Sequence, residues 1–239
     1  MYDFENIKNN VIEILDSKTP VEEKWSTPSS DNDFTYENGI KSWTTAIFID
    51  IKNSSSLFKN QKNEIVSRII RSFSSEIIKI LKSDQNYRDI GIRGDCVYGI
   101  FSTPTKTDIK NIYELAININ TFLYMYYSIL KSKGFPTLTA GIGIGCSQTL
   151  IVKAGLKQSG INDLVWIGDA VVDASNLSGK ANRNGYKPIF ISSCVYSNII
   201  EALRKEYGET RANSWFRQLS FQDVYESDVC YTNYADWLK

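Results

Sequence analysis

Two carboxylates end strand-like segments and could do chemistry together. Asp50 lies at the end of the apolar run of residues 43–51, and Asp95 follows Gly94 within residues 89–101. Two hard oxygen ligands at one point suit Mg²⁺, which keeps several waters and completes its coordination with substrate phosphates. Two such ions about 4 Å apart would hold the attacking and the leaving oxygen of an in-line phosphoryl displacement. The structural alternative is that each aspartate only forms a turn.

Short polar side chains follow Asp50. The backbone amides of Asn53, Ser54 and Ser55 precede or open a predicted helix, where amide groups favour anions. We therefore expect these three residues to bind the phosphates of a nucleoside triphosphate. The same helix is predicted to continue to Leu81, because apolar residues recur at helical spacing. Those apolar residues are Ile65, Ile69, Phe73, Ile77 and Leu81.

The absence of histidine narrows the chemistry. The 239 residues contain no histidine, which excludes Ser-His-Asp and Cys-His nucleophile systems and any zinc site that needs imidazole. Catalysis must therefore use carboxylates, cations, backbone amides or a bound metal. The 27 basic residues balance 27 acidic ones, so no global charge favours nucleic acid or a membrane as a partner.

The cysteines and the N-terminal residues predict a cytoplasmic protein. No apolar run is long enough to span a bilayer, and the acidic start lacks the basic flank of a signal peptide. The cysteines lie far apart in sequence without the spacing of metal ligands. We therefore expect Cys96, Cys146, Cys194 and Cys230 to be reduced thiols.

The order of strands and helices predicts an α+β domain with helices packed on one face of the sheet. A helix and a polar arm, residues 1–38, are expected outside the main core, and a catalytic domain is expected over residues 39–239. A hairpin is predicted over residues 89–101. We expect helices over residues 3–17, 107–131, 169–181 and 194–208, and strands over residues 43–51, 137–145, 164–168, 187–192 and 229–237.

Four segments in this order resemble the class III nucleotidyl cyclases. They are FIDIKNSSS from Phe48, IRGDCVYGIF from Ile92, TAGIGIGCSQTLIVKAG from Thr139 and NDLVWIGDAVVDASNLSGKAN from Asn162, and the likeness spans about residues 43–192. The resemblance implies a ferredoxin-like domain with a mixed or antiparallel sheet. It also implies a homodimer with active sites at the interface, which converts a nucleoside triphosphate into a 3′,5′-cyclic nucleotide and pyrophosphate.

The resemblance assigns roles to individual residues. It implies that Asp50 and Asp95 hold two Mg²⁺ or Mn²⁺ ions, with help from the carbonyl of Ile51. Lys157 matches a position where relatives carry a phosphate-binding cation, and Arg93 is a second candidate for that role. The alternative for Lys157 is a solvated loop lysine, because most lysines are exposed.

The base-selecting positions differ from those of purine cyclases. Gly91 stands where those enzymes carry lysine or glutamate, and Val165 stands where adenylyl cyclases carry aspartate. A purine's polar edge would be left unpaired there, at a cost of about 1–3 kcal/mol per buried group. The run from Asn162 to Gly168 is most similar to bacterial anti-phage pyrimidine cyclases of the Pycsar type. That likeness implies UTP or CTP as the substrate and a separate effector that responds to the product. Gly91 could instead permit a strand bulge or close packing.

A third departure leaves two alternatives open. Val172 and Asn176 occupy the positions where the family has an asparagine and an arginine that stabilises the transition state. Asn176 is our candidate for that catalytic role, and Asp173, Lys180 and Arg183 lie close by in the sequence. The alternatives are a purine cyclase with an atypical pocket and a non-catalytic, cyclase-like nucleotide-binding domain.

Overall fold

Two long antiparallel strands form the centre of the protein. The computed structural model describes residues 2–59, 61–157, 159–219 and 223–238. Strands β2 (Gly39–Ile51) and β5 (Ala140–Leu156) pair along the whole of β2. Their apolar and β-branched residues favour extended backbone that is buried on both faces.

The other strands extend this pair into one mixed sheet. The strand order is β3-β4-β2-β5-β7-β9-β8, and β5 pairs with β7 in parallel. The predicted hairpin is confirmed, since β3 and β4 are antiparallel and joined by a two-residue turn. The bounds are β3 Tyr87–Arg93, β4 Cys96–Ser102, β7 Ile189–Ser192, β8 Arg217–Leu219 and β9 Val224–Ser227.

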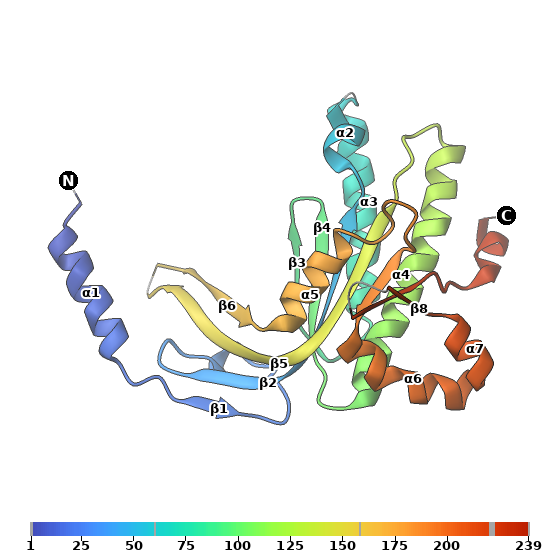
Figure 1. Cartoon of the computed structure of the whole chain (residues 1–239). Coiled ribbons are helices and arrows are strands. Elements are labelled where there is room, and N and C mark those ends of the chain that lie inside the picture. The colour runs from blue at the N-terminus through green and yellow to red at the C-terminus, as the bar shows by residue number, and fades with distance from the viewer. Residues whose placement is uncertain (1, 60, 158, 220–222, 239) are drawn as a thin grey trace.

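The distal ends of β2 and β5 leave the main body as an arm (Figure 1). There β1 (Val21–Glu23) pairs with β2, and β6 (Ile161–Ile167) pairs with β5. Helix α1 (Phe4–Asp16) stands beyond the arm and has no buried residue.

Part of the segment before residue 38 is folded against the sheet, which differs from the polar arm outside the core that we expected. Phe34 is only 4% exposed and packs against Ile40 and Ile151. The backbone N–H of Thr27 donates a hydrogen bond to Ser102, so the chain before residue 38 contacts the main sheet as well.

Three long helices cover one face of the sheet, and a fourth lies on the other. Ile47, Ile49 and Ile51 point into the large core under the three helices, whereas Ala46 and Phe48 pack on the side of α5. The α+β class is confirmed, and α5 adds a helix on the opposite face. The covering helices are α3 Asn63–Leu81, α4 Lys106–Ser132 and α6 Ser193–Tyr207, and α5 is Asp169–Ser178.

The glycines of β5 explain how α5 lies so close to the sheet. A Cβ at Gly143 would be 2.1 Å from the carbonyl oxygen of Ala174, and one at Gly141 or Gly145 would also meet α5 or the chain just after it. Isoleucines at the alternate positions of this strand fill the opposite core. The Gly-Ile alternation therefore gives one strand two different faces.

Two local predictions are wrong, and one short helix was not predicted. The helix predicted from Ser54 to Leu81 is two helices, α2 (Ser54–Lys59) and α3, because Lys62 is extended with φ −66° and ψ 137°. The predicted strand over residues 229–237 is a turn of 3₁₀ helix over Thr232–Leu238. A short helix, α7 (Glu209–Ser214), was not expected.

Two cysteines are paired rather than reduced. Cys146 of β5 forms a disulfide with Cys194 of α6, with Cα atoms 5.9 Å apart. Cys96 and Cys230 remain free thiols. Sequence could not indicate this pair, because the partners are 48 residues apart and no local pattern joins them. Within the described residues, no helix has the length and apolar character needed to cross a membrane.

Candidate active site

The two predicted acids lie at the same edge of the sheet. Asp50 is opposite Cys96 in the pairing of β2 with β4, and Asp95 directly precedes Cys96 in the hairpin turn. Paired residues in antiparallel strands lie about 5 Å apart. The expectation that the strands bring both carboxylates to one place is therefore confirmed.

The surroundings of Asp50 disfavour an unpaired negative charge. Burial raises the pKa of this carboxyl, Arg183 counteracts that rise, and the charge of Asp95 raises the pKa further. Two negative charges near one another in a partly buried place repel each other, and a nearby cation stabilises both of them. Burial raises the pKa of the neighbouring Cys96 thiol to about 12, with the charges of Asp50 and Asp95 contributing to the rise.

The guanidinium of Arg183 partly neutralises this negative charge. Nη2 of Arg183 lies 2.6 Å from Oδ2 of Asp50 and 3.4 Å from the carbonyl oxygen of Ile51. Sequence reasoning placed Arg183 near the site but did not pair it with Asp50. The sequence carries a local signal for a tight loop here, because Asn182 and Asn184 flank the arginine and asparagine adopts positive φ readily. Both residues have positive φ in the structure.

The oxygen donors fit a hard divalent cation. Asp50, Asp95 and the Ile51 carbonyl supply oxygen atoms only, which is the donor set that Mg²⁺ and Mn²⁺ prefer. A cationic nitrogen of Arg183 already contacts two of these three donors. Among the described residues, no group of three or more Asp, Glu or Cys side chains is placed so that it could hold a metal ion by itself. A cation here would therefore take its other ligands from water and substrate.

The predicted phosphate-binding segment follows directly. Asn53 adopts the left-handed conformation with φ 55°, so the chain turns sharply after β2. Ser54 and Ser55 then form the first turn of α2. These three residues lie next to Asp50 and Ile51 along the chain, where the sequence predicted them.

The predicted base-pocket residues have a clear structural context. Gly91 is opposite Tyr98 in the hairpin, and a Cβ at position 91 would lie 2.5 Å from the tyrosine hydroxyl. The Tyr98 ring stacks on Phe48, and its hydroxyl donates a hydrogen bond to Asp89. Gly91 is thus the close-packing glycine of our alternative, and Tyr98 fills the space of a longer side chain. Sequence reasoning missed Tyr98. Val165 of β6 is 40% exposed.

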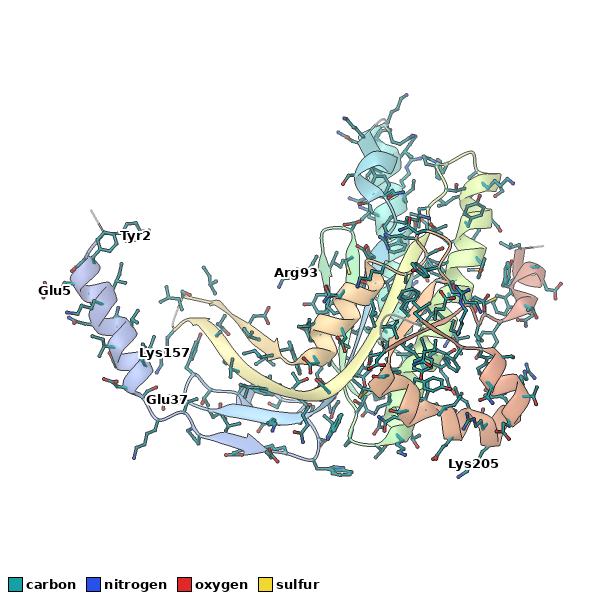
Figure 2. The ribbon with its side chains drawn as sticks, viewed as in Figure 1. Tyr2, Glu5, Glu37, Arg93, Lys157 and Lys205 are labelled. Carbon is teal, nitrogen blue, oxygen red and sulfur yellow. A yellow bond between two sulfur atoms is a disulfide. The ribbon has the colours of Figure 1, made fainter. Side chains whose placement is uncertain are left out.

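The two predicted phosphate-binding cations lie apart from each other. Arg93 is exposed at the tip of the β3–β4 hairpin, whereas Lys157 is at the tip of the arm (Figure 2). Nζ of Lys157 lies 3.6 Å from a carboxylate oxygen of Glu37. Lys157 therefore does not join Asp50 within one chain.

The α5 positions face solvent. Val172 is 55% exposed, and Asn176, one turn later, is exposed on the same side of the helix. Among the described residues, neither of these two forms a hydrogen bond with Asp50. Asp173 lies between them in sequence, and burial raises its pKa, with Asp169 adding to the effect.

Comparison with known proteins decides the family. A uridylate cyclase of Treponema porcinum is 41% identical over 237 residues, which are 99% of this chain and 81% of that protein. A uridylate cyclase of Gulbenkiania mobilis is 33% identical over 206 residues, which are 82% of this chain and 79% of that protein. The chain belongs to the uridylate cyclase family. No family model matches it.

Solved structures agree with this assignment at the level of the fold. A class III adenylyl cyclase-like ATP-binding protein from Pseudomonas aeruginosa superposes with a TM-score of 0.66 at 17% identity, over 98% of this chain and 49% of that one. The predicted resemblance to class III nucleotidyl cyclases is thereby confirmed for the fold, and the pyrimidine-cyclase branch is confirmed by the curated relatives.

Proposed function

We propose that this protein converts UTP, or CTP, into the 3′,5′-cyclic nucleotide and pyrophosphate. The observation that carries the proposal is the convergence of Asp50, Asp95 and the Ile51 carbonyl in a chain 41% identical to a uridylate cyclase. UTP is favoured over CTP because both relatives reported above are uridylate cyclases.

The proposed cation ligands are Asp50, Asp95 and the carbonyl of Ile51, and the ions are Mg²⁺ or Mn²⁺, two per site. When bound, such ions neutralise phosphate charge and make the 3′-hydroxyl more acidic. The chain's own part is to hold two carboxylates on rigid strands, since Asp50 lies between β4 and β5 in the sheet. The 3′-hydroxyl attacks the α-phosphate, and pyrophosphate leaves.

The proposed phosphate contacts come from the turn after β2. The amides of Asn53, Ser54 and Ser55 begin one residue beyond Lys52, so they are close to any phosphate that shares a cation with Asp50. Arg93, the last residue of β3, is two residues from Asp95 and adds an exposed positive charge beside the hairpin turn.

The proposed base pocket lies around Gly91, Tyr98 and Val165. Tyr98 supplies a flat surface and a hydroxyl, and Phe48 stacks behind it. A pyrimidine is smaller than a purine, and Tyr98 narrows the space at position 91. This is consistent with selection of a pyrimidine by size.

We infer a homodimer whose active sites lie between the two copies. Lys157 lies at the tip of the arm, and Asn176 is exposed on α5, so we infer that both act at the site of a second copy. Apolar side chains at the surface support such an interface, since Ile161 is 75% exposed and Ile167 is 52% exposed. The anti-phage role and the separate effector are proposed from the resemblance alone.

A direct assay tests the proposed reaction. Purified protein is incubated with Mn²⁺ and each of ATP, GTP, CTP and UTP, and the products are resolved by chromatography with Asp50→Ala as the control. We expect cyclic UMP as the main product, and its loss in the variant. Turnover of ATP alone would disprove the pyrimidine assignment.

A second candidate is a nucleotide-binding domain without catalysis. Val172 and Asn176, at the positions of the transition-state asparagine and arginine, are the observation that favours it. UTP binding by calorimetry, with no turnover of any nucleotide under the same conditions, would support this alternative.

Mixing two impaired variants tests the shared site. Asp50→Ala and Lys157→Ala are expected to be defective separately, because each damages every site of its own homodimer. Random exchange into heterodimers should restore about a quarter of the wild-type activity, since each heterodimer has one undamaged site. Absence of recovery after confirmed exchange would contradict the arrangement.

A further inference from the structure

Arg183 occupies the position where a cation is expected. Its Nη2 donates hydrogen bonds to Oδ2 of Asp50 at 2.6 Å and to the Ile51 carbonyl at 3.4 Å. These are two of the three oxygen donors in the proposed metal site. The side chain is 20% exposed, and that of Asp50 is 26% exposed, so the pair is shielded from solvent more than a typical surface salt bridge.

The arginine is held in this place by its own loop. Nη1 donates to the carbonyl oxygens of Ser178 at 2.9 Å and Ala181 at 3.0 Å; Ser178 is the last residue of α5, and Ala181 lies just after the helix. Nδ2 of Asn182 donates to the carbonyl of Ala140, which fixes the loop against the start of β5. The guanidinium is therefore anchored on one edge and directed at Asp50 with the other.

The opposite strand leaves room for this arrangement. Gly141 is the partner of Asp50 in the β2–β5 register. A Cβ at position 141 would be 3.0 Å from Nη1 of Arg183 and 2.3 Å from the Ser178 carbonyl oxygen. Any larger residue would displace the guanidinium or its anchor, so the strand, the loop and the acid together form one built site for this cation.

The charges in this site define what Arg183 does to a metal ion. A free divalent ion must share or break the Asp50–Arg183 ion pair before it can use Asp50. A triphosphate changes the balance, because guanidinium groups bind phosphate oxygens as readily as carboxylates. The displaced Arg183 would then gain a new anionic partner close by.

We propose that Arg183 is a positioning residue that binds Asp50 until the divalent cation replaces it. The cation and the triphosphate then bind together rather than separately. The inference rests on the proposed function for the identity of the site. It assigns to Arg183 a role in coupling the two ligands, which differs from that of the family's helix-borne arginine.

Direct measurement of Mn²⁺ binding tests this role without turnover. Wild type and Arg183→Gln are titrated with Mn²⁺, and the free ion is followed by electron paramagnetic resonance. We expect Arg183→Gln to bind Mn²⁺ alone roughly tenfold more tightly, which corresponds to about 1.4 kcal/mol. Equal or weaker binding by a folded Arg183→Gln would overturn the proposal.

Two control variants separate charge from folding. Lys187→Gln removes a positive charge from the same loop, where Lys187 pairs with Asp228, and it should leave Mn²⁺ affinity unchanged. Arg183→Lys retains the charge but loses the two-edged guanidinium, so its Mn²⁺ affinity should lie between those of wild type and Arg183→Gln. Tighter binding by Lys187→Gln, equal to that of Arg183→Gln, would show a general effect of net charge and overturn the specific role.

A wild-type experiment keeps the proposal testable if Arg183→Gln does not fold. Inorganic tripolyphosphate and Mn²⁺ are titrated together by calorimetry, with Asp50→Asn as the reference for association in solution. We expect each ligand to tighten the binding of the other, and independent binding would overturn the inference. If Arg183→Gln binds Mn²⁺ more tightly and this coupling is present, but no nucleotide is cyclised, the proposed function fails and the role of Arg183 stands.

Discussion

The two ends of the β2–β5 strand pair share the same backbone pairing but differ in the elements that pack against them. At the Ile51 end, α5 covers one face and α3 and α4 cover the other, and Asp50 is held between two neighbouring strands. At the Gly39 end, β1 and β6 pair with the outer edges of the two strands, and the segment around Phe34 packs on one face. One continuous sheet is therefore enclosed by helices at one end and carries exposed apolar side chains at the other.

The side chains of the arm agree with this division. Leu156 is 67% exposed and Val21 is 53% exposed, whereas Ile47 and Ile49 at the other end are fully buried. Helix α1 carries Phe4 and Leu15 at 74% and 77% exposure. A helix of this length is marginal in water without tertiary contacts. Apolar side chains are therefore exposed on the arm and buried in the body.

The largest expected effect comes from the acids of the body. Asp50→Ala or Asp95→Ala should reduce cyclase activity by roughly 10²–10³-fold, as expected for removal of one charge that stabilises the transition state. Glu23→Ala is the matched acid on the arm, since it pairs with Lys41 at the surface. Initial rates of cyclic nucleotide formation should be unchanged in that variant, and an equal loss would end the distinction between the two regions.

The next effect concerns the packing of α5 on the body. Gly143→Ala should lower the free energy of unfolding by about 2–3 kcal/mol, because the new Cβ would meet the Ala174 carbonyl oxygen at 2.1 Å. Gly179→Ala is the control, since its Cβ would lie at an ordinary 3.7 Å from the nearest atom. Urea denaturation measures both, and similar stabilities would show that α5 does not lie against β5.

A smaller effect is expected where the hairpin approaches the arm. Burial raises the pKa of Asp89, and the charge of Asp163 on β6 raises it further. The folded state therefore binds a proton more strongly than the unfolded state, and stability falls as pH rises from the unfolded pKa through the folded one.

Asp89→Asn should remove this dependence. The variant should gain stability over wild type at neutral pH and lose that gain below the ordinary aspartate pKa. Thermal melting at a series of pH values measures the difference. A constant difference at all pH values would mean that Asp89 does not titrate across this junction.

The smallest effect on monomer stability is expected from removal of residues 2–17. Helix α1 has no buried residue, so its deletion should change the free energy of unfolding by less than about 0.5 kcal/mol. Urea denaturation at low protein concentration measures this. A loss above about 1 kcal/mol would show that α1 contacts the body of the protein.

The sequence by itself determined the features that depend on neighbouring residues. Strand alternation and a Gly-Asp turn are local patterns, so the positions of Asp50 and Asp95 followed from the residues around them. Apolar residues at helical spacing predicted α1, and Gly94 between two strand-like halves predicted the hairpin. The break before Asn63 was missed because no proline or glycine marks it.

Only the tertiary structure decided which distant groups meet. Arg183 and Asp50 are separated by 133 residues, and the side of the sheet that α5 covers is set by the close approach that the β5 glycines permit. The Cys146–Cys194 bridge and the separation of Lys157 from Asp50 have the same origin. Local patterns fix backbone conformation, but contacts between remote segments depend on how complete elements pack.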